Sequence, residues 1–300
     1  MLNIWITRGR CLARVAVLAL AGLAALPGHA AAQRFFPSPQ AAVDALVDSL
    51  ARQDDAELSA LLGPDGKALI ALDDISVEDR YDFLAAWAQG HRVIAEGRSR
   101  ARLVLGNGWS LPIPVVRSEN GWGFDARAGR KEMQVRRIGR NELAAIESMR
   151  AFVAAQKEYA ALNPGSDGRA AFAQKIVSTP GQRDGLYWTT TAGEPQSPLG
   201  PLFEGREHKG GYHGYRFRIL KAQGPAAAGG ARHYVKDGRM TEGFALVGWP
   251  VRYGETGVMT FLVNQDGQVF QKSLGPQTAS LVGAMTRFDP DPSWQPVPQP

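Results

Sequence analysis

The residues of this sequence that could do chemistry gather in one irregular stretch, residues 178–214, which reads STPGQRDGLYWTTTAGEPQSPLGPLFEGREHKGGYHG. A loop of this length inside a compact domain is usually either functional or disordered. Its aromatic residues favour a packed loop, because disordered segments are poor in aromatics. Arg183 and Asp184 could pair with each other or contact a polar ligand, and Tyr187 and Trp188 could line a small-molecule site. The same residues could equally form the loop's own core.

Further candidates lie at the exit of this loop and in the first half of the chain. Tyr212, His213 and Tyr215 stand at the exit, and His91 stands between a predicted helix and a predicted strand. Imidazole is the side chain that titrates nearest neutral pH. His213 or His91 would therefore be the candidate base if the protein were an enzyme. His208 and His213 are five residues apart in a glycine-rich stretch, which is weak spacing for metal ligands.

Well-known catalytic and cofactor motifs are not found in the sequence. It has no G-x-S-x-G elbow, no S-x-x-K, no H-E-x-x-H zinc motif, and no Walker or G-x-G-x-x-G loop. The sequence therefore predicts no cofactor and no metal site. A Ser/His/Asp triad assembled from distant residues is compatible with almost any sequence, so that possibility stays open.

The first 32 residues predict a secretory signal peptide. Three arginines without an acidic residue precede the apolar run VAVLALAGLAALP, and HAAAQ then supplies small residues for cleavage near Ala30–Ala32. The run is shorter than the ~20 apolar residues that span a bilayer. We therefore expect a periplasmic or secreted protein with no transmembrane segment in the mature chain, and an uncleaved N-terminal anchor is the alternative. The single cysteine, Cys11, lies in the leader, so the mature chain can form no disulfide.

The charge of the chain argues against nucleic acid as a partner. The formal net charge of the whole chain is +5, and loss of the leader's three arginines lowers it by three, to about +2. Nucleic-acid-binding domains usually concentrate basic residues on one face. The one local cluster, Arg130 to Arg140, also holds Glu132, which favours a solvated helix face.

Residues 33–128 predict a first α+β domain. In PSPQAAVDALVDSLARQ, Ser38 is a suitable N-cap for a helix, and further helical periodicity extends to residue 90. From His91 the apolar period changes to two, and Asn107-Gly108 and Asn120-Gly121 predict hairpin turns. This order resembles the NTF2-like, or cystatin-like, fold, which implies N-terminal helices on a curled antiparallel sheet with a cone-shaped cavity.

Residues 129–288 predict a second α+β domain that contains the 178–214 loop. NELAAIESMRAFVAAQKEYAAL has apolar residues along one side of a helix, which we expect to be buried along Ile146, Met149 and Val153. We expect Gly139 to end a preceding helix. Strand-like stretches follow the loop, and residues 289–300 predict a proline-rich, flexible tail.

The helix of this second domain, with the later run GFALVGWPVRYGETGVMTFLVNQDGQVF, resembles the globular domain of type IV pilins and pseudopilins. The resemblance implies a long helix packed on a second antiparallel sheet. The chain lacks the apolar half-helix by which pilins polymerise, so a filament subunit is not expected.

Over most of its length the chain resembles the bacterial family catalogued as domain-of-unknown-function 2950. The resemblance is carried by IGRNELAAI, TPGQRDGLYW, SPLGPL, GYHGYRFRIL and GETGVMTFLVNQDGQVFQKSLGP. It implies a secreted or periplasmic protein without an established activity. We expect a non-catalytic binding or envelope-assembly module whose partner is a periplasmic protein or a small ligand. The alternative is a periplasmic hydrolase or isomerase that uses the N-terminal cone or the 178–214 loop.

Overall fold

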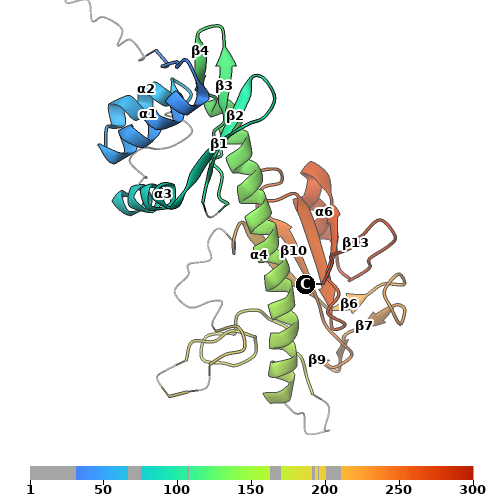
Figure 1. The fold of residues 1–300 in the computed structure, drawn as a ribbon. Helices are drawn as coiled ribbons and strands as arrows, with labels where there is room; N and C mark the ends of the chain where they lie inside the picture. The colour runs from blue at the N-terminus through green and yellow to red at the C-terminus, as the bar shows by residue number, and fades with distance from the viewer. Residues whose placement is uncertain are drawn as a thin grey trace, which may run out of the picture. The chain divides into compact units, whose positions relative to one another are not determined.

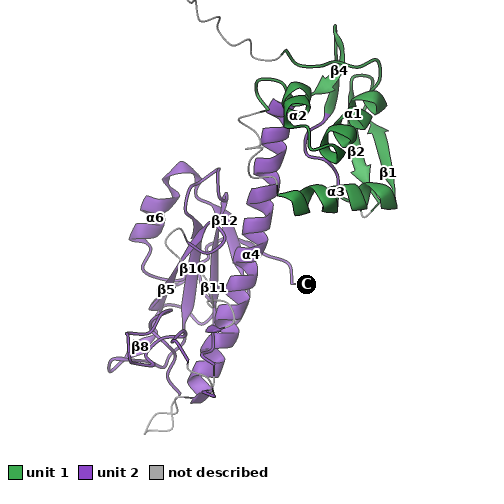
Figure 2. Cartoon of the chain, turned by 90° about the vertical axis from the view of Figure 1, so that its left-hand side faces the viewer, with its two compact units in different colours: residues 1–109, 115–124 green, residues 110–114, 125–300 purple. Residues whose placement is uncertain are grey.

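The computed structural model has a mixed α+β fold, as the sequence predicts (Figure 1). It describes residues 32–66, 76–106, 108–162, 170–190, 193–194, 196–200 and 211–299. Two compact units are present (Figure 2): unit 1 is Met1–Trp109 with Val115–Phe124, and unit 2 is Ser110–Pro114 with Asp125–Pro300. The expected signal peptide falls almost entirely outside the described residues. None of the described helices is both long and apolar enough to cross a membrane.

Unit 1 begins with three capped helices: α1 (Pro39–Ala51), α2 (Asp55–Leu62) and α3 (Val77–Gln89). Ser38 caps α1 as predicted, because its side chain accepts a hydrogen bond from the amide of Ala41. Asp54 caps α2 in the same way, and Ser76 forms a reciprocal capping box with Asp79 at the start of α3. Local side-chain chemistry therefore sets where each helix begins.

The sheet of unit 1 is a simple antiparallel meander in the order β1-β2-β3-β4. Its strands are β1 (His91–Ala95), β2 (Arg100–Leu105), β3 (Val115–Ser118) and β4 (Gly121–Phe124). Every second residue of β2 is buried, which matches the period read from the sequence. The core between the helices and the sheet contains Val43, Leu46, Leu61, Leu103 and Val115.

The hairpin predicted at Asn120-Gly121 forms, but its turn is one residue earlier than predicted. Ser118 pairs with Gly121, so Glu119 and Asn120 are the turn residues. Gly121 instead begins β4, with a φ of 117°. A Cβ at this position would lie 2.7 Å from the carbonyl oxygen of Phe36, which explains the need for glycine. Asn107, the first residue of the other predicted turn, lies outside the described residues.

Unit 2 is organised by α4 (Ala126–Leu162), a single helix of 37 residues. The prediction that Gly139 ends a preceding helix is wrong, because α4 continues through it. Glycine in a helix costs about 1 kcal/mol relative to alanine, and contacts on the following turn oppose that cost. Asn141 donates a hydrogen bond to the carbonyl of Thr256, and Glu142 accepts one from the amide of Val258.

The main sheet of unit 2 has five antiparallel strands in the order β13-β12-β11-β10-β5. Their bounds are β5 (Tyr215–Leu220), β10 (Ala245–Pro250), β11 (Met259–Asn264), β12 (Phe270–Ser273) and β13 (Gln295–Pro296). Two short ribbons pair β6 (Ala222–Gln223) with β7 (Arg232–His233), and β8 (Val235–Lys236) with β9 (Arg239–Met240). A 3₁₀ turn, η2 (Gly275–Gln277), leads into α6 (Thr278–Ala284).

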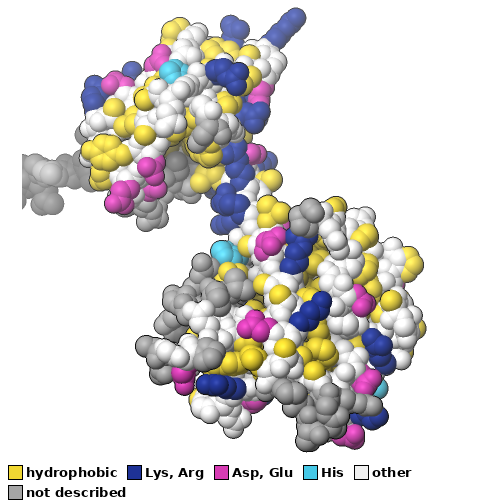
Figure 3. All heavy atoms as spheres, turned by 60° about the horizontal axis from the view of Figure 1, so that its bottom comes forward, with side chains coloured by type: hydrophobic (Ala, Val, Ile, Leu, Met, Phe, Trp, Pro, Cys, Tyr) yellow, Lys and Arg dark blue, Asp and Glu magenta, His cyan; other side chains and the backbone are white. Residues whose placement is uncertain are grey.

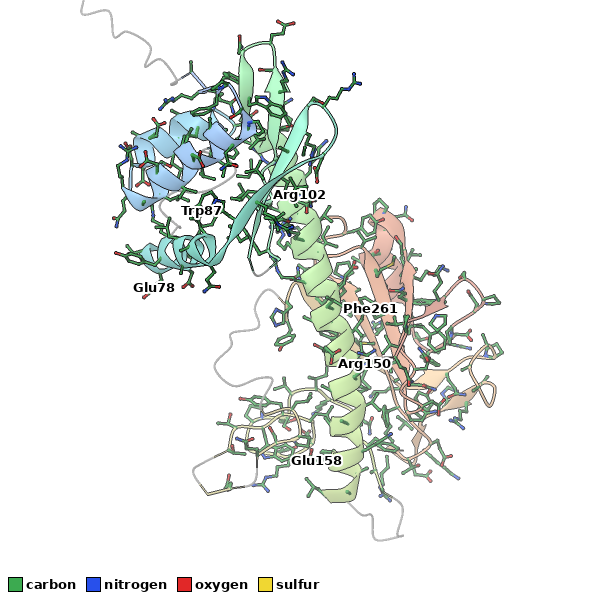
Figure 4. The ribbon with its side chains drawn as sticks, in the orientation of Figure 1. Glu78, Trp87, Arg102, Arg150, Glu158 and Phe261 are labelled. Atoms are coloured by element: carbon green, nitrogen blue, oxygen red, sulfur yellow. The ribbon has the colours of Figure 1, made fainter. Side chains whose placement is uncertain are left out.

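The helix α4 packs on β10 and β11, and Phe261 of β11 lies beside it (Figure 4). The predicted burial holds for Met149 and Val153, and Ile146 is partly buried against the same core. Leu143 departs from the expected apolar stripe, because 66% of it is exposed. The sheet and the C-terminal half of α4 therefore form one continuous apolar core.

The C-terminal tail packs instead of extending freely. Gln295 pairs with Gln271 as part of β13, and the amide of Val297 donates to the carbonyl of Val269. Trp294 is only 7% exposed, and Val297 is buried as well. The proline-rich composition predicts mobility, but these two large apolar side chains favour burial enough to order the segment. Proline is tolerated here because β13 is an edge strand.

Candidate functional site

Several of the predicted site residues line one open cavity of unit 2, which we call the loop cavity. Its volume is about 560 Å³. It is formed almost entirely by the first part of the irregular stretch identified in the sequence. Its lining is Val177, Ser178, Thr179, Pro180, Gly181, Gln182, Arg183, Tyr187, Trp188, Thr189 and Glu194.

The wall of the loop cavity is held by backbone hydrogen bonds within the loop. Val177 and Tyr187 form a parallel β-bridge, in which the amide of Ser178 donates to the carbonyl of Tyr187. The amide of Tyr187 donates in turn to Ile176. Gly185 lies where the two bridged segments approach each other, and a Cβ there would lie 2.8 Å from the backbone nitrogen of Ser178. The chain therefore closes on itself without a helix or a long strand.

Asp184 is the polar centre of this wall. It accepts hydrogen bonds from the Lys175 ammonium at 2.6 Å, from the Thr179 amide at 2.7 Å and from the Thr179 hydroxyl at 2.8 Å. The Lys175 bond and the two Thr179 bonds hold the pKa of the Asp184 carboxyl well below its usual range. Asp184 therefore stays ionised and closes the loop by pairing with Lys175, whereas the sequence suggested Arg183 as its partner.

Arg183 faces the loop cavity beside Trp188. Its guanidinium carbon lies 5.5 Å from the centre of the Trp188 ring, and its Nη2 lies 3.6 Å from Oε1 of Glu194. The backbone carbonyl of Arg183 accepts a hydrogen bond from the Tyr159 hydroxyl of α4, which fixes this residue to the helix. Burial and the negative charge of Asp184 raise the pKa of Tyr159, so the hydroxyl stays protonated and able to donate.

The aromatic part of the lining comes from Tyr187 and Trp188, both partly buried against the core of unit 2. The indole Nε1 of Trp188 is buried and has no hydrogen-bond partner among the described residues. The cavity therefore combines two aromatic side chains with hydroxyl, amide and charged groups.

The residues at the exit of the stretch do not join the lining of the loop cavity. Tyr212 lines a separate, narrow and apolar gap with Phe152 and Phe217. His213 is exposed, with a φ of 47°, and its ring meets Tyr212 edge-on at 4.4 Å between centres. Tyr215 is fully buried in the core of unit 2, and its hydroxyl donates to the carbonyl of Met259. Burial, with the nearby Glu142 carboxylate, raises the pKa of Tyr215 far above the physiological range.

His91 belongs to unit 1, where its side chain packs against the helix α3. Its ring stacks on Trp87 of α3, labelled in Figure 4, with 3.4 Å between ring centres and 7° between planes. Its Nδ1 lies 3.2 Å from the carbonyl oxygen of Trp87, near the C-terminus of α3. At this position a histidine side chain can hydrogen-bond to one of the last carbonyl groups of the helix.

A family model described as "Protein of unknown function (DUF2950)" matches residues 33–297. The chain belongs to the DUF2950 family. No curated protein and no solved structure matches the chain. The NTF2-like and pilin-like resemblances of the two halves therefore stay predictions.

Sequence reasoning missed three residues that shape the loop cavity of this DUF2950 protein. Lys175 and Thr179 hold Asp184, and Glu194 faces Arg183. Lys175 lies just before the stretch singled out in the sequence, so no local signal marked it. Leu202, Phe203 and His208, which also belong to the stretch, lie outside the described residues.

Charge in this DUF2950 protein is mixed on the face drawn in Figure 3, where acidic, basic and hydrophobic side chains are interspersed over unit 2. In the basic part of α4, Arg136 pairs with Glu132 at 2.8 Å and donates to the carbonyl of Ser110. Within the described residues no group of three or more His, Cys, Asp or Glu side chains could hold a metal ion.

Proposed function

We propose that this DUF2950 protein is a secreted or periplasmic binding module that holds a small polyhydroxylated ligand, such as a sugar, in the loop cavity. The observation that carries the proposal is the cavity itself, about 560 Å³ in volume and walled by a hydrogen-bonded loop. Ligand sites typically have volumes of about 300–1,000 Å³ and combine aromatic lining with a few fixed polar groups.

The composition of the lining supports a sugar-like ligand. Tyr187 and Trp188 supply aromatic surface. Rings that carry a polar group suit ligands that have both apolar and hydrated polar surfaces. Thr179, Thr189 and Gln182 add hydroxyl and amide groups that both donate and accept hydrogen bonds. Such groups match the alternating donors and acceptors of a polyol.

The charged residues support binding in preference to catalysis. A general base works best with a pKa near the operating pH. The pKa of Asp184 is instead lowered, away from the operating pH, by Lys175 and Thr179. The described lining contains no histidine, and neither His91 nor His213 is part of it. Among the described lining residues, a hydrolase or isomerase would therefore find no imidazole to serve as its base.

The test is calorimetric titration of the mature chain, residues 33–300, with a panel of monosaccharides, disaccharides and cell-wall fragments, preceded by thermal-shift screening. A ligand at a hundredfold excess over its Kd adds about 2.7 kcal/mol of stability. Arg183→Met and Trp188→Phe are expected to weaken binding of any hit at least several-fold.

The matched control is Lys272→Met, which removes a cation lying 5.9 Å from the ring centre of Trp294, elsewhere in unit 2. It should bind the hit as the unaltered protein does. The proposal would be overturned if no ligand of the panel bound, or if the affinity fell equally in all three variants. The proposed location has its own check: mass spectrometry of the exported protein should show an N-terminus near residues 31–33, and an intact leader would contradict it.

A further inference from the structure

The strand β5 ends the main sheet of unit 2 on the side opposite β13 (Figure 2). Among the described strands, its one neighbour in this sheet is β10, and the two strands run antiparallel. In such a pair, successive residues direct their amide and carbonyl groups alternately toward the neighbouring strand and away from it. Half of the main-chain groups of β5 therefore point outward from the sheet.

The hydrogen bonds at the start of β5 show which residues point outward. Gly214, just before the strand, accepts a hydrogen bond from the amide of Val251 on the β10 side. Tyr215 instead exchanges two main-chain hydrogen bonds with Tyr212. Tyr212 therefore lies on the outer side of β5, and the odd-numbered residues of the strand are the ones that point outward.

The other end of the strand agrees with this alternation. The carbonyl of Lys221 accepts a hydrogen bond from the amide of Tyr234, again on the outer side. Between these two ends, the amides and carbonyls of Phe217 and Ile219 also point outward, and they have no hydrogen-bond partner among the described residues. We call these four main-chain groups the β5 edge.

The narrow apolar gap described above lies beside the β5 edge. Side chains alternate along a strand, so Phe217 and Ile219 share one face. This is the face that α4 covers, because the Phe217 ring and the Met149 sulfur both lie against Gly248. The lining of the gap is Ser148, Phe152, Ile176, Leu199, Tyr212, Phe217 and Leu246.

The size of the gap suits one aliphatic side chain. Its volume is about 50 Å³. A single water-sized group needs about 10–15 Å³, so the gap has room for roughly three to five heavy atoms. A valine or leucine side chain has that size.

The opposite face of β5 carries two arginines. Arg216 is exposed, whereas Arg218 donates to the carbonyls of Val282 and Met285 at the end of α6. Neither arginine forms an ion pair with any residue that the structure describes. Opposite charges on neighbouring strands attract each other when they are directly paired or diagonal. An acidic residue on an added strand, opposite Arg218 and diagonal to Arg216, would therefore be favoured.

The other edge of the main sheet is protected against pairing with another chain. β13 is only two residues long and includes Pro296, which has no amide to donate. Short strands and proline are common protective devices at sheet edges. β5 has six residues and no proline, and the two residues of its edge are apolar and partly exposed.

We propose that the β5 edge binds a short extended segment of a partner protein, with the pattern apolar–acidic–apolar, as an added antiparallel strand. In this mode of recognition, main-chain hydrogen bonds give affinity, and contacts of alternate side chains give specificity. Phe217 and Ile219 provide the main-chain bonds, the gap receives one apolar side chain, and Arg216 attracts the acidic one.

The segments that flank the β5 edge set its direction and its length. The bridge at Tyr212 and the β6–β7 ladder are both antiparallel, so an added strand continues their direction. Between them, about three residues of a partner can pair at ~3.4 Å each. A contact this small gives a weak complex that exchanges rapidly.

The test is NMR titration of the mature chain, residues 33–300, with the blocked peptide Thr-Val-Glu-Val-Thr, in which the amides of Phe217 and Ile219 are expected to shift. N-methylation of both valines removes the two donors that face β5, and it should weaken binding about 5-fold or more. N-methylation of the glutamate is the matched control, because its amide points away from β5 in an antiparallel pair. That peptide should bind as the unmodified one does.

The charge preference is tested with Arg216→Glu. This variant should bind the glutamate peptide more weakly and should prefer the peptide in which lysine replaces glutamate. Arg117→Glu reverses the charge of an exposed arginine of unit 1 and should keep the original preference. Ile219→Pro removes one outward amide at an edge position, where proline is tolerated, and should also weaken binding.

The proposal is overturned if no peptide shifts the amides of Phe217 and Ile219, or if methylation of the valines and of the glutamate has the same effect. A concentration-dependent dimer that Ile219→Pro abolishes would assign the β5 edge to a second copy of this chain, which also overturns the proposal. Arg183→Met should leave peptide binding unchanged, so the result is independent of the loop cavity.

Discussion

The interface between α4 and the five-stranded sheet is built from apolar side chains, whereas the wall of the loop cavity is held by polar ones. Met149 and Phe152 of α4 pack against a core that includes Phe261 and Leu246. One turn further along the same helix, Gln156 and Tyr159 contact the segment around the loop cavity through hydrogen bonds. A single helix therefore serves two regions by two kinds of interaction.

The difference shows how the domain can combine a stable scaffold with an open site. Apolar burial is non-directional and roughly proportional to the apolar area removed from water. Hydrogen bonds and ion pairs are directional, and they position main-chain and side-chain groups around a space that stays open to solvent. Loops on rigid scaffolds commonly carry binding residues for this reason.

The largest effect is expected from Met149→Ala, which tests the apolar interface. Met149 is fully buried, and truncating a buried methionine to alanine costs about 2–5 kcal/mol because a cavity remains. The free energy of unfolding, measured in urea, should fall by that amount at any pH where the protein is folded. The control is Leu143→Ala, on the same helix and largely exposed. Equal losses in the two variants would show that α4 is not held by this core.

A smaller effect is expected from Gln156→Met, which tests the polar connection between α4 and the segment preceding the loop. The Gln156 side chain is fully buried; its amide nitrogen donates to the carbonyl of Ala173, and its oxygen accepts from the amide of the same residue. Methionine would leave the amide and the carbonyl of Ala173 unpaired, at a cost of about 1–3 kcal/mol for each group, which burial of the more apolar methionine side chain partly offsets.

The measurement for Gln156→Met is hydrogen exchange, in which the amide of Ala173 should lose protection beyond the global loss of stability. Lys157→Met, at the next and exposed position of α4, is the matched control. Unchanged protection of Ala173 in Gln156→Met would contradict the role given to this side chain.

The smallest and most local effect concerns Asp184 and depends on pH. Its pKa is lowered in the folded protein, chiefly by Lys175 and then by Thr179. A carboxyl with a depressed folded pKa contributes stability above its unfolded pKa of about 3.9, and that contribution is lost as pH falls below this value. Amides of the loop wall, such as that of Tyr187, should therefore lose exchange protection on acidification.

In Asp184→Asn the same amides should be less protected at neutral pH, and their acid dependence should largely disappear. Asp291→Asn is the control, because the pKa of Asp291 is lowered by Ser293 in the C-terminal segment, away from this loop. A loop whose protection follows pH identically in the Asp184 variant and the unaltered protein would refute the role of this carboxylate.

The residues that determine local structure could be read from the sequence alone. Helical and strand periods predicted α1 and β2, and Ser38 predicted the cap that begins α1. The Asn120-Gly121 pair predicted the hairpin between β3 and β4, with a turn one residue away from the observed one. These signals work because capping, turn geometry and side-chain alternation depend on residues only a few positions apart.

Only the tertiary structure decided which polar residues meet. Asp184 has a neighbour in sequence, Arg183, that could have been its partner, yet it pairs with Lys175. Tyr215 looked like a site residue and is instead buried in the core. Tertiary contacts also decided that α4 continues through Gly139 and that Trp294 is packed. In each case contacts between distant segments outweigh local preferences of about 1 kcal/mol, and such contacts have no signature in a short stretch of sequence.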